Sequence, residues 1–155
     1  MHQSYRFAIA YFALFGALLL GSGALLFFQK LGMSYESVQN FYLGSKVAFT
    51  QVKSTFGLLE TALPHLGAMG LFIFVTGHFM LFSSKKEKQK TILPIVFLFI
   101  AALFDIGSGF LIVQGWTFFV GVKIAAFLLL QSLGIYLLFV LFKTTLTSIN
   151  TYAKH

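Results

Sequence analysis

The sequence contains no cysteine, only two prolines, a single arginine and few charges, since 10% of its 155 residues are Asp, Glu, Lys or Arg. The absence of cysteine excludes disulfide bonds, thiolate nucleophiles and cysteine-ligated zinc or iron–sulfur centres. Soluble domains carry about 25% charged residues. A chain with so little charge is therefore not an ordinary soluble domain.

Apolar residues make up most of what is present: 58% of the chain is hydrophobic, with 21 Phe, and there are also 14 Gly. A helix needs about 20 apolar residues to cross the roughly 30 Å hydrocarbon core of a bilayer. Four stretches reach that length, namely residues 7–28, 61–82, 92–113 and 116–142. The predicted fold class is an all-α integral membrane protein, a single domain over residues 1–155 built as a four-transmembrane-helix bundle.

The charges lie mainly outside these stretches, and their distribution predicts an orientation. The N-terminus, the connection 83–91 and the tail 143–155 hold seven basic residues and one acid. The connection 29–59, taken with Glu60, holds three basic and two acidic residues. Short connections rich in Lys and Arg stay in the cytoplasm. We therefore expect a protein of the bacterial cytoplasmic (inner) membrane with both termini inside, and no nucleic-acid partner despite the net charge of +7.

Small residues recur along one face of the first stretch. Ala13, Ala17 and Gly21 follow one another at four-residue spacing. Side chains this small let a second helix approach closely in a membrane. We predict a helix-packing face here, and the bilayer, a homo-oligomer or a larger membrane complex as the partners of the chain.

The outer connection, residues 29–59, is long for a helical bundle and should carry structure of its own. Ser34 is a suitable N-cap, Gly44 is suited to a left-handed cap at a helix end, and apolar side chains repeat at helical spacing between them. This pattern predicts a short amphipathic helix on the outer surface. Residues 46–53 are predicted to form a covering flap.

The second apolar stretch carries two of the four histidines. Thr61 is the predicted N-cap, because Pro64 is tolerated in a first helical turn and would kink the helix if it lay deeper. That places His65 in the first turn, near the outer end. His78 follows thirteen residues later, towards the cytoplasmic end.

In its spacing, this pair of histidines resembles the haem ligands of di-haem b-type cytochromes, in which one membrane helix supplies a ligand to each of two stacked haems. The resemblance implies haem b at His65 or His78. At 1.5 Å per residue the two imidazoles lie roughly 20 Å apart, so one iron cannot bind both. The other histidines are terminal, so haem would need Met69 or Met80 of another copy, a symmetric dimer, or a partner subunit to supply the opposing ligand.

Asp105 lies within the third stretch, about 12 Å from its end, where a carboxylate is expensive and is either paired or functional. Ala101 and Gly109 share its helix face, which directs the acid into the bundle along a path of small residues. Lys123 falls at a similar depth across the hairpin formed by the third and fourth helices. We predict an Asp105–Lys123 ion pair, serving either helix register or proton movement, with Gln131 extending the polar stripe.

Together, His65, Asp105, Lys123 and Glu60 are expected in the outer half of the membrane. Such a set suits a quinone head group, a proton entry path or an ion site. No Ser–His–acid arrangement, phosphate-binding loop or metalloprotease motif accompanies it, so neither a catalytic centre nor a metal site is predicted within the chain.

Two functions remain open from the sequence. The first is a membrane subunit of a respiratory or electron-transfer system, contacting haem b or quinone through the histidines of the second helix. The second is a non-redox accessory subunit, or a small proton- or ion-coupled transporter, in which the same polar residues act as gates.

Overall fold

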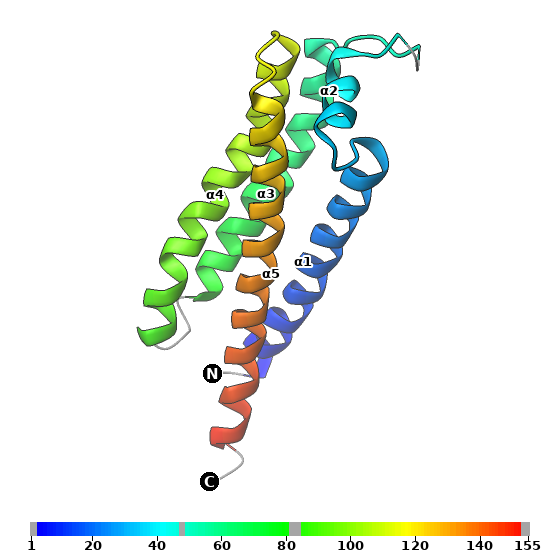
Figure 1. Cartoon of the computed structure of the whole chain (residues 1–155). Coiled ribbons are helices and arrows are strands. Elements are labelled where there is room, and N and C mark those ends of the chain that lie inside the picture. Colours follow the sequence, from blue (N-terminus) through cyan, green and yellow to red (C-terminus); the bar gives the residue numbers. More distant parts are fainter. Residues whose placement is uncertain (1–2, 47–48, 81–84, 153–155) are drawn as a thin grey trace.

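The computed structural model describes residues 3–46, 49–80 and 85–152, which form five helices. The helices are α1 (Gln3–Lys30), α2 (Tyr35–Leu43), α3 (Thr55–Met80), α4 (Lys85–Val113) and α5 (Phe119–Tyr152). The four long ones are apolar and long enough to cross a membrane. They run alongside one another, and the short α2 lies at one end, next to the start of α3 and the α4–α5 turn (Figure 1). We call this end of the bundle the α2 end.

The long helices carry large apolar side chains on their outer faces as well as inside. Phe15, Phe74 and Phe139, on three different helices, are all mostly exposed. A helix that is apolar all round is typical of a membrane span, because lipid replaces water on its outer side. These exposed faces therefore form a surface suited to contact with hydrocarbon.

Helix α5 packs against each of the other long helices, most extensively against α4. Two glycines lie in close contact with side chains of neighbouring helices. A Cβ added at Gly134 of α5 would lie 2.8 Å from Cδ1 of Leu20, and one added at Gly16 of α1 would lie 2.8 Å from Cε2 of Phe72. Both neighbours belong to the central core of the bundle. These two glycines therefore allow α1 to dock.

The small-residue face predicted on α1 differs from the face through which α1 docks on the other helices. Ala13 is half-buried beside the core, but Ala17 and Gly21 are exposed, and a Cβ at Gly21 would meet no atom of the described residues within 4 Å. All three line a shallow groove of about 590 Å³ between α1 and α5. The helix turns a neighbouring face inward, because Leu20 offers more apolar surface to the core than the alanines do.

Three helices begin earlier than predicted, α1 at Gln3, α3 at Thr55 and α4 at Lys85, whereas α5 begins later than predicted, at Phe119. The N-cap of α3 is Ser54, whose Oγ accepts a hydrogen bond from the Gly57 N–H at 3.1 Å, so the prediction of Thr61 as N-cap was wrong. Pro64 is consequently the tenth residue of α3, and Pro94 is likewise the tenth residue of α4. Prolines are tolerated inside membrane helices because neighbouring groups satisfy the freed carbonyls. They did not mark the helix starts.

Polar segments predicted as connections are largely helical. Residues 85–91 belong to α4, and the predicted tail from residue 143 continues α5 to Tyr152. Lys, Glu and Gln are good helix formers, which accounts for residues 85–91; residues 143–152 are rich in Thr and Ser and continue α5 despite their lower helix propensity. The rest of the predicted connection, residues 83–84, lies outside the described residues.

Helix α2 begins and ends where the sequence indicates. The Ser34 Oγ caps it by accepting from the Ser37 N–H at 3.0 Å. Gly44 ends it with φ +79°, although its ψ of 165° is extended rather than that of the predicted left-handed cap. A side chain at Gly44 would lie 2.6 Å from the Thr50 carbonyl oxygen, so the following segment folds back closely here. The returning segment, part of the predicted flap, pairs through one isolated bridge between Ser45 and Thr50.

Candidate functional site

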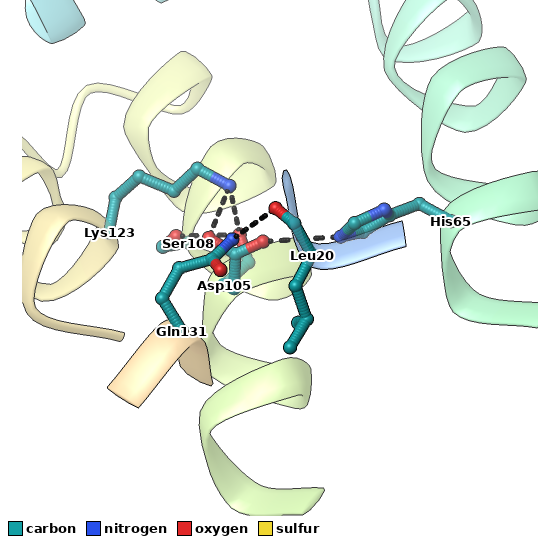
Figure 2. A network of polar contacts seen from close by, with 6 residues as sticks. All are labelled: Leu20, His65, Asp105, Ser108, Lys123 and Gln131. Atoms are coloured by element: carbon teal, nitrogen blue, oxygen red, sulfur yellow. Dashed lines mark hydrogen bonds and ion pairs between the residues drawn. The ribbon is translucent and has the colours of Figure 1, made fainter. Parts of the chain in front are cut away.

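Asp105 and Lys123, predicted to pair, lie in contact inside the bundle. The Lys123 Nζ donates to the Asp105 Oδ1 at 2.8 Å and to the Asp105 main-chain carbonyl at 2.6 Å. The Asp105 side chain is only 7% exposed and the Lys123 side chain 10%. The short turn after Val113 makes α4 and α5 antiparallel neighbours, which is why residues on opposite sides of it meet at one depth. Figure 2 shows the lysine reaching over Asp105.

His65 of α3 contacts the same carboxylate from the other side. Its Nε2 lies 3.5 Å from the Asp105 Oδ2, and its side chain is 37% exposed. Asp105 thus uses one oxygen towards the lysine and the other towards the histidine (Figure 2). We call His65, Asp105 and Lys123 the Asp105 cluster. It joins three helices at one buried carboxylate.

The sequence placed His65 in a first helical turn, and the structure corrects this. His65 is the eleventh residue of α3, about 15 Å from its start at Thr55. Its environment is therefore set by the Asp105 carboxylate and not by the unpaired amides of a helix end. His65 meets Asp105 because the two residues lie at the same level of the bundle, and not because His65 belongs to a helix end.

The electrostatics of the Asp105 cluster depend on the histidine. A lone carboxylate inside a membrane helix costs about 2.5 kcal/mol or more, and a paired cation offsets that cost. With Lys123 charged and His65 neutral, the cluster carries no net charge. A proton arriving at the imidazole makes the net charge +1 and turns the His65 contact into a second ion pair. Asp105 is then shared between two cations.

Ser108 adds a further bond within α4, because its Oγ donates to the Asp105 carbonyl at 3.2 Å. That carbonyl therefore accepts from both Ser108 and Lys123. The backbone at Asp105 is held as well as its side chain.

The other predicted polar residues have other partners or exposed positions. Glu60 is exposed on α3, five residues before His65. Gln131 of α5 donates to the Leu20 carbonyl at 3.2 Å and so links α5 to α1 (Figure 2). His78 is exposed, with its ring 6.5 Å from that of Phe74. The structure does not bring the two histidines of α3 together.

Ala101 and Gly109, the small residues that share a face of α4 with Asp105, are both buried but have different neighbours. Ala101 is buried in the central core. Gly109 is buried against Tyr42 of α2, and a Cβ added there would lie 2.9 Å from the Tyr42 Cε1 and 3.2 Å from its hydroxyl oxygen. Gly109 lies one turn beyond Asp105 on the same face.

Tyr42 is the residue near the site that sequence reasoning missed. It is 6% exposed and packs with Val38, Ile112 and Val120. Burial, and secondly the negative charge of Asp105, raise the pKa of the Tyr42 hydroxyl well above its usual range. The only signal in the sequence was the glycine at position 109, which permits an aromatic ring to approach the helix backbone.

Four apolar spans around an internally paired charge cluster define a multi-pass integral membrane protein, in contact with the lipid bilayer. The chain belongs to the Aq_1264_TM family, described as a transmembrane helical domain, whose model matches residues 32–151. The match includes α2, α3, α4 and nearly all of α5, and hence the whole Asp105 cluster, whereas α1 precedes it. No curated protein and no solved structure matches the chain in the comparisons made with them.

Proposed function

We propose that this protein is a proton-coupled membrane protein, a small transporter or gate, in which the Asp105 cluster binds the proton. One observation carries the proposal: a buried carboxylate contacts a buried lysine at 2.8 Å and a partly exposed histidine at 3.5 Å. Histidine is the side chain that exchanges protons near neutral pH. Here it lies between the exterior of the bundle and a charge pair inside it.

Protonation of His65 has a mechanical consequence in this geometry. A charged imidazole competes with Lys123 for Asp105, and the lysine keeps a second acceptor in the Asp105 carbonyl. Since His65 belongs to α3 and Lys123 to α5, a change in the balance between them favours a shift of α3 relative to the α4–α5 hairpin. Proton binding is thereby coupled to helix position.

We further propose that the α2 end faces outward from a bacterial cytoplasmic membrane, with both termini in the cytoplasm. The excess of Lys and Arg in the terminal segments and in the α3–α4 connection supports this orientation. Exposed Glu60 supports a water boundary near that level of α3. His65 then lies about 7.5 Å below Glu60 along the helix, within reach of protons from the outer solution.

Electron transfer through contact with haem b or quinone is the second candidate function. The partly exposed His65 ring, flanked on α3 by exposed Leu63 and Leu66, is suited to a quinone head group arriving from lipid. Haem ligation fits less well, because the His65 Nε2 already faces Asp105 and His78 lies about 20 Å away along the helix. A homo-oligomer or larger complex stays a prediction from the sequence.

Proton flux into proteoliposomes, reported by a trapped pH-sensitive dye under an imposed potential, tests the proposal. The matched variant is Asp105→Asn with Lys123→Met, which removes both buried charges together. We expect flux by the wild-type protein to exceed that of empty liposomes and to fall at least about tenfold in the double variant. Equal flux in wild-type and empty liposomes contradicts the proposal. A haem or quinone absorption spectrum in the purified wild-type protein, lost in His65→Ala, would favour the second candidate instead.

A further inference from the structure

Helix α2 covers the end of the α4–α5 hairpin next to the Asp105 cluster. Val38 is fully buried and Tyr42 nearly so, and both belong to one buried apolar cluster with Ile112 of α4 and Val120 of α5. The α4–α5 turn, just beyond these residues, accepts a hydrogen bond from α2, because the Tyr35 hydroxyl donates to the Thr117 carbonyl at 2.7 Å. Helix α2 is therefore docked on the hairpin and does not lie loose on the surface.

Within α2, Tyr42 is the residue directed at the site. Its ring occupies the space that a side chain at position 109 would take, with only 2.9 Å between the Tyr42 Cε1 and a Cβ placed on Gly109. Gly109 and Asp105 are four residues apart on one helix face. The raised pKa of the Tyr42 hydroxyl, part of which comes from the charge of Asp105, agrees with this proximity.

Helix α2 is held by hydrogen bonds at both ends and by burial of its apolar side chains. Beyond the Tyr35 bond, the Lys53 N–H donates to the Tyr42 carbonyl at 2.9 Å, which ties the end of α2 to the segment leading into α3. Isolated helices shorter than about 12 residues are marginal on their own, and α2 has 9. Its position thus depends on the burial of Val38 and Tyr42.

We propose that Tyr42 is a gate residue: its ring closes the Asp105 cluster against the solution at the α2 end and leaves the His65 side as the route of access. The gate's role in proton movement rests on the proposed function. The closure itself rests on packing and is measurable without any flux.

Because the chain has no cysteine, a single introduced thiol reports accessibility directly. Ser108→Cys places that thiol beside Asp105, at a residue that is 1% exposed. The measurement is its rate of modification by a small, cationic, water-soluble methanethiosulfonate reagent in the full chain in nanodiscs. The rate is compared with Tyr42 intact, with Tyr42→Ala and with Tyr42→Phe.

The gate predicts that Tyr42→Ala raises the modification rate at least about tenfold, while Tyr42→Phe stays within about twofold because the ring is what fills the space. Tyr11→Ala, on the exposed face of α1, is the matched control and should change nothing. A second reporter, Thr76→Cys on α3, also fully buried, detects loosening of the whole bundle. An unchanged rate at position 108 in Tyr42→Ala overturns the gate, and so does an equal acceleration at positions 76 and 108.

The gate and the proton function fail separately. If the proton function also holds, Tyr42→Ala increases dye-reported proton flux. If Tyr42→Ala accelerates modification at position 108 but the wild-type protein shows no proton flux, the gate is supported and the proton function is contradicted. Wild-type flux with no effect of Tyr42→Ala on the thiol contradicts the gate alone.

Discussion

The Lys123 Nζ donates to Asp105 twice, to the carboxylate Oδ1 at 2.8 Å and to the main-chain carbonyl at 2.6 Å. One ammonium group of α5 therefore holds both the side chain and the backbone of a single residue of α4. This fixes the register of the α4–α5 hairpin at the depth where His65 approaches from α3. This contact stabilises the fold and, in the proposed function, holds Asp105 where His65 meets it, and the two roles are separable by experiment.

Neutralising only one member of the pair should destabilise the bundle. Asp105→Asn leaves the Lys123 ammonium buried with its main-chain acceptor but without a counter-charge, a change that costs about 3–5 kcal/mol in buried pairs. The double variant, Asp105→Asn with Lys123→Met, should recover most of that loss. The free energy of unfolding in mixed detergent micelles measures both variants. A double variant no more stable than Asp105→Asn would show that the two side chains do not stabilise each other.

Gly109→Ala should disturb α2. The added methyl group would lie 2.9 Å from the Tyr42 Cε1, so the ring must shift, and overpacking of this kind costs about 1–3 kcal/mol. The matched control is Gly107→Ala on the same helix, where a Cβ meets no described atom within 4 Å. That control should be neutral or stabilising by up to about 1 kcal/mol, as expected for Gly→Ala inside a helix. Thermal unfolding distinguishes the pair, and equal midpoints would contradict the contact with Tyr42.

The docking of α1 is tested at Gly134 in the same way. A Cβ there meets the Leu20 side chain at 2.8 Å, whereas one at Gly121, also on α5, meets nothing within 4 Å among the described residues. We expect Gly134→Ala to loosen α1 and Gly121→Ala to leave it in place. Limited proteolysis of the 31–34 segment after α1 reports the difference. Faster cleavage in both variants, or in neither, would argue against close packing at Gly134.

The raised pKa of Tyr42 predicts the direction of a stability change at alkaline pH. The folded state keeps the hydroxyl protonated at pH values where the unfolded chain, with a tyrosine pKa of about 10, loses the proton. The folded state then binds more protons, so the unfolding free energy falls as pH rises above about 10. Tyr42→Phe should show a shallower fall than the wild-type protein, because it removes the group whose pKa is raised in the folded state. Parallel curves for Tyr42→Phe and the wild type would place Tyr42 outside the buried environment described here.

The main features of the fold could be predicted because apolar length and hairpin geometry determine them. Asp105 lies eight residues before the end of α4 at Val113 and Lys123 four residues after the start of α5 at Phe119, and the long lysine side chain closes the gap between these two levels of the antiparallel hairpin. The helix starts could not be predicted from Pro64 and Pro94, because a membrane bundle tolerates both prolines ten residues into their helices.

The details of packing depended on tertiary contacts that no local pattern encodes. Ala17 and Gly21 repeat at the spacing of a packing face, yet Gly16 and Gly134 make the close contacts, because large neighbours such as Leu20 decide which face turns inward. The approach of Tyr42 to Gly109 joins segments 67 residues apart, so neither residue alone indicates it.

We propose that His65, acting on Asp105, is the proton-binding residue of this membrane protein. The most direct measurement compares dye-reported proton flux in proteoliposomes for His65→Gln and His78→Gln, a matched pair on one helix of which only the first contacts Asp105. We predict that His65→Gln lowers flux at least about tenfold and that His78→Gln retains the wild-type rate. Equal flux in the two variants would contradict the account.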